Sequence, residues 1–194
     1  QKLQNQIGIL KSRSLVSRTV KSLNLKYSCF LEDNFLTSEV YNESPFSIAI
    51  DTSQLQPVGS LKFYVTITSP DEYRLEAEGQ DLAMYDYRTY KEGDKKLASV
   101  KYDKKHRFGE KVTTSDFSFQ IDKTAKFDAK TSLNQRYYFV FNSLNSLISE
   151  FSGYEIEPIN KEASIVEISL KGNNPQKAVD FLNQLTREYI RQGL

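Results

Sequence analysis

Two carboxylates are the side chains best spaced for catalysis. Glu76 and Glu78 stand two residues apart in the alternating segment YRLEAE at 73–78, so on a strand both would face the same way. Such a pair can act as acid and base on a glycan. Charged side chains are mostly exposed unless they are paired, however. We therefore favour a solvated sheet face over a hydrolase site and assign no catalytic residue.

The chain has one cysteine, Cys29, and one histidine, His106. A single cysteine excludes an intrachain disulfide, and this pair is too few for a zinc site of the usual Cys and His ligands. Cys29 lies in the apolar segment YSCF, which indicates a small buried side chain rather than a nucleophile. The sequence also lacks phosphate-binding GxxxxGK[ST] loops, GxSxG elbows and HExxH motifs. We expect no metal and no cofactor.

Two segments have residue types suited to binding a glycan. Tyr85, Tyr87 and Tyr90 lie close together, and aromatic rings can stack on sugars, although tyrosine more often lies at a sheet edge with a wet hydroxyl. The charged segment 101–111 is rich in Lys and Arg and predicts a basic loop, which is more often simply solvated. A carbohydrate-binding module that uses these residues is therefore the alternative interpretation.

Composition indicates a soluble globular chain. The 194 residues are 39% hydrophobic and 26% charged, which predicts a single domain over 1–194 with a substantial core. The net charge of +1 gives no electrostatic reason to expect nucleic acid as a partner. The longest apolar runs, such as YYFVF at 137–141, are too short to cross a bilayer.

Both ends of the chain have helical patterns. Residues 1–25 predict two amphipathic helices, the second capped by Ser12 or Ser14. At the other end, Asn174 and Pro175 predict a helix start. Its expected apolar stripe is Ala178, Leu182, Leu185 and Tyr189. A helix that has only begun where the sequence stops predicts a domain excised from a longer protein.

Between these ends the hydrophobic period changes to two. Leu61, Phe63, Val65 and Ile67 alternate with polar residues and predict a half-buried strand. The other predicted strands are 46–50, 73–78, 83–90, 117–121, 137–143, 154–159 and 163–172. A short helix is expected over 143–153. The predicted fold class is α+β, with a mostly antiparallel sheet packed with N-terminal helices, an internal short helix and a C-terminal helix.

The two terminal segments together resemble one family. QNQIGILKSRSLVSRTVKSLNL, at 4–25, carries a Ser12–Arg13 pair before a helix, and NPQKAVDFLNQLTREY, at 174–189, carries Asn183, Arg187 and Tyr189. Both are similar to the extracytoplasmic region of chain-length determinant proteins, the Wzz-type polysaccharide co-polymerases. Their Wzc-type relatives are fused to tyrosine autokinases, and the segment 137–153 looks like that branch.

The resemblance implies a periplasmic domain of the bacterial inner membrane, anchored by one membrane helix on each side. Family members form homo-oligomeric rings that work with the polymerase and export machinery. They set the length, or permit the export, of capsule, exopolysaccharide or O antigen. The kinase site of the fused branch is cytoplasmic, so the resemblance implies no catalysis here. It makes Ser12, Arg13, Asn183, Arg187 and Tyr189 the candidate assembly positions.

Overall fold

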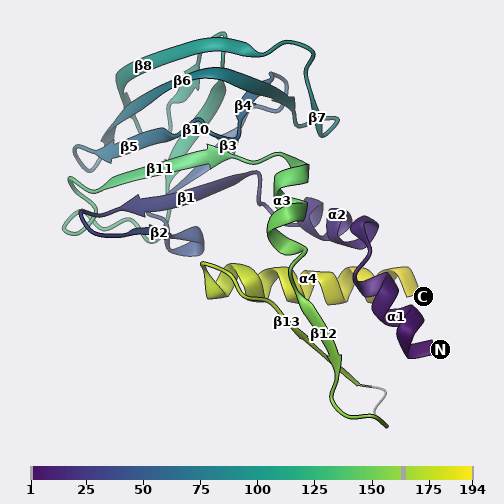
Figure 1. Cartoon of the computed structure of the whole chain (residues 1–194). Coiled ribbons are helices and arrows are strands. Elements are labelled where there is room, and N and C mark those ends of the chain that lie inside the picture. Colours follow the sequence, from purple (N-terminus) through teal and green to yellow (C-terminus); the bar gives the residue numbers. More distant parts are fainter. Residues whose placement is uncertain (1, 163–164, 194) are drawn as a thin grey trace. The chain divides into compact units, whose positions relative to one another are not determined.

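The computed structural model describes residues 2–162 and 165–193. It has the predicted α+β architecture, with helices at both ends and mostly antiparallel sheets (Figure 1). The chain forms two compact units, each described here by itself. Unit 1 combines residues 1–25 with 144–194, and unit 2 comprises residues 26–143. That the chain acts as one domain stays a prediction.

The larger sheet of unit 2 is antiparallel, with the strand order β2-β1-β11-β5-β6-β4; β7 and β8 also pair with β6. Its strands are β1 (Tyr27–Glu32), β2 (Thr37–Glu39), β4 (Gln56–Val58), β5 (Phe63–Ile67), β6 (Glu72–Asp86), β7 (Lys91–Glu92), β8 (Leu97–Arg107) and β11 (Arg136–Phe141). The 3-10 helix η1 (Tyr41–Glu43) follows β2. The alternation predicted for β5 is confirmed, because Phe63, Val65 and Ile67 are all buried.

The core of unit 2 lies between this sheet and a smaller one. The smaller sheet has the order β3-β10-β9 and contains β3 (Phe46–Ile50), β9 (Lys111–Thr113) and β10 (Ser118–Lys123). Phe63 joins the two sheets, since its ring centroid lies 5.1 Å from that of Phe117 and 5.3 Å from that of Phe119. The rings of Phe139 and Phe141 lie equally close on β11. Buried aromatic side chains of this size dominate core energetics.

Two predictions about this unit are wrong. The strands expected at 73–78 and 83–90 are continuous through residue 86, as β6. The expected basic loop at 101–111 is mostly strand β8, which pairs along β6 from Arg107 to Leu97. Charged residues are common on edge strands, where they oppose edge-to-edge association. The many charged residues of this segment therefore led to the prediction of a loop. The structure instead shows strand β8, which pairs with β6.

Unit 1 contains the helices α1 (Lys2–Leu10), α2 (Arg13–Ser22), α3 (Leu144–Phe151) and α4 (Pro175–Gly193), with the hairpin β12 (Glu155–Pro158) and β13 (Val166–Ser169). Ala163, the predicted start of the last strand, lies outside the described residues. Both predicted caps are confirmed. Ser12 accepts a hydrogen bond from the Leu15 amide, and Asn174 accepts one from the Lys177 amide. Among the helices of the described ranges, none has both the length and the apolar character needed to span a membrane.

The buried face of α4 differs from the predicted stripe. Ala178 and Leu185 are buried as expected, but Phe181 is buried in place of Leu182. The Phe181 ring stacks on Phe151 of α3, with centroids 4.5 Å apart. Because the larger ring takes the core position, Leu182 and Tyr189 lie on a second, partly exposed face.

Candidate functional site

An apolar groove of about 580 Å³ lies on unit 1, between α4 and β13. Its lining residues are Leu10, Val166, Ile168, Val179, Leu182, Asn183, Thr186, Tyr189 and Ile190. Val179 is 46% exposed and Ile190 is 54% exposed. Single exposed apolar side chains are ordinary, but apolar side chains gathered in one groove make it a candidate interaction site. We call this surface the α4 groove.

The α4 groove contains two of the five candidate assembly positions. Asn183 and Tyr189 line it directly. Arg187 is exposed beside the lining residue Thr186 and forms no ion pair with the described residues. The C-terminal motif therefore lies along one helix face that remains open.

The other two candidate positions have local structural roles. The Ser12 side chain caps α2. Arg13 donates from its guanidinium to Asn145 Oδ1 on α3, at 2.6 Å. The candidate positions therefore have two different roles. Ser12 and Arg13 hold α2 in place, whereas the C-terminal positions lie at or beside the α4 groove.

Buried charges fix the rotation of α4. Glu188 is buried and accepts hydrogen bonds from Ser22 Oγ of α2 at 2.9 Å and from Gln184 Nε2 at 3.0 Å. Lys177 is also buried, and its Nζ lies 3.0 Å from Glu150 Oε1 of α3. A buried charge that loses its partner is costly, so these contacts hold one helix face inward. Neither residue was expected to be buried, because charged side chains ordinarily lie at the surface.

Two of the three candidate glycan contacts are not open to a ligand. Tyr85 is 3% exposed and Tyr87 is 4% exposed, and their rings pack against each other with centroids 5.0 Å apart. The Tyr87 hydroxyl lies 2.7 Å from the Asn142 carbonyl oxygen, and burial raises its pKa. Tyr90 remains partly exposed in the turn after β6. Glycan binding through Tyr85 and Tyr87 is therefore incompatible with this fold.

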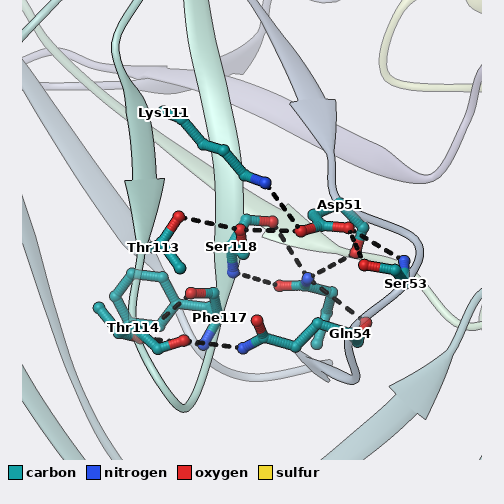
Figure 2. Close-up of polar contacts among 9 residues, drawn as sticks. Asp51, Ser53, Gln54, Lys111, Thr113, Thr114, Phe117 and Ser118 are labelled. Carbon is teal, nitrogen blue, oxygen red and sulfur yellow. Dashed lines mark hydrogen bonds and ion pairs between the residues drawn. The ribbon is translucent and has the colours of Figure 1, made fainter.

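A dense polar network surrounds Asp51 in unit 2 (Figure 2). The carboxylate accepts hydrogen bonds from the Ser53 amide at 3.0 Å and from Ser118 Oγ at 3.2 Å, and Lys111 Nζ lies 3.2 Å away. The bonds from Ser53, followed by that from Lys111, lower the Asp51 pKa. Gln56 is fully buried nearby and donates to the backbone oxygens of Asp51 and Ser118. The network joins the loop after β3 to the β9–β10 hairpin, so we assign it a structural role.

Replacing Asp51 with asparagine is expected to destabilise unit 2 at neutral pH. The folded pKa lies below the ordinary value of about 4, so the carboxylate stabilises the fold above that pH. This contribution is lost as the pH falls through the folded pKa. Urea denaturation across acidic and neutral pH should show a smaller pH dependence in the variant. Parallel profiles for the two proteins would contradict this role.

One hydrogen-bonded arrangement is similar to a catalytic relay. The Tyr102 hydroxyl lies 2.6 Å from His106 Nε2, and His106 Nδ1 lies 3.4 Å from Glu110 Oε1. Nucleophilic catalysis requires an activated nucleophile, but burial raises the pKa of Tyr102 and favours its neutral hydroxyl. Cys29 is buried and burial raises its pKa to about 12, so its thiol is also protonated. We assign neither group a catalytic role.

The predicted carboxylate pair lies on the solvent face of β6. Glu76 stands opposite Asp103 of β8, and Glu78 stands opposite Lys101. Arg74 lies 3.7 Å from Glu76 and 2.6 Å from Asp103. The solvated-face interpretation is therefore confirmed. Across the described ranges, no group of three His, Cys, Asp or Glu side chains is arranged to hold a metal ion.

Comparison with known proteins does not identify the chain. Neither a protein family nor a curated protein matches its sequence. Two crystal structures of Xanthomonas campestris FlgL are similar at TM-scores of 0.20 and 0.21, with 11% and 9% sequence identity. The similarity covers 84% of this chain in both cases, but the chain spans only 38% and 44% of theirs. Similarity at this level carries no argument about fold or function.

Proposed function

We propose that this chain is a non-catalytic assembly and regulatory domain of a polysaccharide co-polymerase. It acts at the periplasmic face of the bacterial inner membrane and controls the length or export of a capsule, exopolysaccharide or O antigen. The observation that carries the proposal is the position of the C-terminal motif: Asn183 and Tyr189, picked out by the resemblance, line the open α4 groove. A motif that served only folding would have no need to remain on an open apolar face.

The occupant of the α4 groove in this proposal is a second copy of the chain. Unit 1 has the complementary charges that such a contact needs. Arg187 borders the groove, and Glu155, Glu157 and Glu167 are exposed together on one face of the β12–β13 hairpin. None of these four side chains forms an ion pair with the described residues. Contact between two different surfaces of one chain is heterologous, and such contacts form a ring when the rotation from one copy to the next closes.

The arrangement of the chain ends supports the same proposal. The first and last described helices, α1 and α4, belong to unit 1 and contact each other (Figure 1). Segments attached to these two helices would leave from the same unit, which is compatible with membrane connections on both sides. The polymerase and export machinery are the further partners that this function implies.

The double variant Val179→Asp/Ile190→Asp tests the proposal in the full-length protein. Both side chains are exposed, so the substitutions leave the core intact, but they place carboxylates in the apolar groove, where they would meet the acidic hairpin face of the second copy. We expect the oligomer to dissociate and the polymer-length distribution to shift, as read by native gel and by polysaccharide electrophoresis. Leu36→Asp is the matched control, because Leu36 is an exposed apolar residue of unit 2. Normal assembly and polymer length in the double variant would refute the proposal.

A further inference from the structure

Three aromatic rings form a row on the solvent face of the larger sheet. Phe30, Tyr138 and Tyr64 lie on the neighbouring strands β1, β11 and β5, directly opposite one another in the strand register. The ring centroids of Phe30 and Tyr138 are 4.9 Å apart, and those of Tyr138 and Tyr64 are 5.7 Å apart. All three side chains are half-buried. Strand spacing gives the row a length of roughly 10 Å.

Cations accompany this aromatic row. Lys62 Nζ lies 4.7 Å from the Tyr138 ring centroid, and the Arg136 guanidinium carbon lies 3.8 Å from that of Tyr64. Arg136 also pairs with Glu32 at 2.8 Å. Lys62 is exposed and has no carboxylate partner in the described part of the chain. Over the same ranges, the hydroxyls of Tyr64 and Tyr138 form no hydrogen bond.

We propose that this row is a binding site for an acidic oligosaccharide. The half-exposed rings offer apolar contact to the C–H groups of a sugar, and the two hydroxyls offer hydrogen bonds. The Lys62 ammonium is complementary to a carboxylate on the ligand. The length of the row fits a short oligosaccharide better than a single sugar. This site lies in unit 2 and does not depend on assembly through the α4 groove.

The charges beyond the row favour a saccharide over a nucleic acid. The same register continues from Tyr64 to Glu76 of β6 and then to Asp103 of β8. These carboxylates would repel any anionic chain that extended past Tyr64, so an acidic saccharide bound here has to be short enough to stay on the row beside Lys62. Arg74 is already held by Asp103 through two hydrogen bonds, at 2.8 and 2.6 Å. Binding of single-stranded nucleic acid needs a continuous positive track, and this face has charges of both signs.

Calorimetry on the intact chain tests the site, with an oligogalacturonate, a neutral malto-oligosaccharide and an oligothymidylate as probes. We expect the oligogalacturonate to bind more tightly than the other two. Tyr64→Ala/Tyr138→Ala should weaken its affinity by about ten-fold or more. Lys62→Ala should weaken it and reduce its salt dependence. Lys104→Ala is the matched control, because Lys104 also lies over a tyrosine ring, that of Tyr102, outside the row.

The more conservative variant Tyr64→Phe/Tyr138→Phe keeps both rings, and so separates loss of binding from loss of fold. It should retain the wild-type unfolding midpoint and lose part of the affinity. Tighter binding of the neutral sugar or of the oligothymidylate would overturn the assignment, as would unchanged affinity in the alanine and Lys62 variants. The absence of binding by all three probes would overturn it as well, and would leave the assembly proposal unaffected.

Discussion

Replacing Phe63 with alanine is expected to lower the free energy of unfolding of unit 2 by about 3–5 kcal/mol. The Phe63 side chain is fully buried and contacts four phenylalanine rings from β10, β11 and the residue before β10. The substitution leaves a cavity between two sheets that are both anchored elsewhere, so collapse can fill it only in part. A loss of this size is a large fraction of the stability of an ordinary domain.

Urea denaturation followed by circular dichroism measures the effect of Phe63→Ala. Phe35→Ala is the matched control, because it removes the same atoms from a side chain that is 92% exposed. The control should change the stability little. A Phe63 variant as stable as the control would contradict the central place of this ring in the core.

Replacing Phe181 with alanine is expected to destabilise unit 1 by about 3–5 kcal/mol. Phe181 is fully buried, stacks on Phe151 and also contacts the Tyr154 ring, with centroids 5.7 Å apart. It is the largest apolar side chain that α4 buries. Loss of this anchor should loosen the helix and with it the α4 groove, so assembly should decline together with stability.

Hydrogen exchange localises the effect of Phe181→Ala. Amides of α4 should lose protection in the variant, whereas those of β5, which belongs to unit 2, should keep it. Ile190→Ala is the control within the same helix, since Ile190 is largely exposed. Unchanged protection of α4 in the Phe181 variant would show that other contacts hold the helix.

The sequence predicted the elements whose two faces differ in polarity. β5 was predicted correctly because its core residues alternate strictly with polar ones. β8 was missed because its exposed edge has charges on both faces. The burial of Tyr85 and Tyr87 was missed because it depends on tertiary packing, in which Tyr85 stands opposite the buried Gln56 of β4. Nothing in the spacing of the tyrosines indicates this pairing.

The candidate sites depend on long-range pairing that a sequence pattern does not contain. A period of 3.6 accommodates either Phe181 or Leu182 in the buried stripe of α4, and the stacking partner Phe151 decides between them. That choice also leaves Leu182 and Tyr189 at the α4 groove. Similarly, Tyr64 was expected on a polar strand face, but only the pairing of β5 with β11 places it beside Tyr138.

The most direct test of the assembly proposal is site-specific photo-crosslinking in the full-length protein in its membrane. A photoreactive phenylalanine analogue at Ile190 would report what contacts the α4 groove, and the same analogue at Leu36 would serve as the control. We predict a crosslink from position 190 to a second copy of the chain, on the acidic face of its β12–β13 hairpin. Crosslinks from position 190 only to other proteins, or none at all, would contradict assembly through this groove.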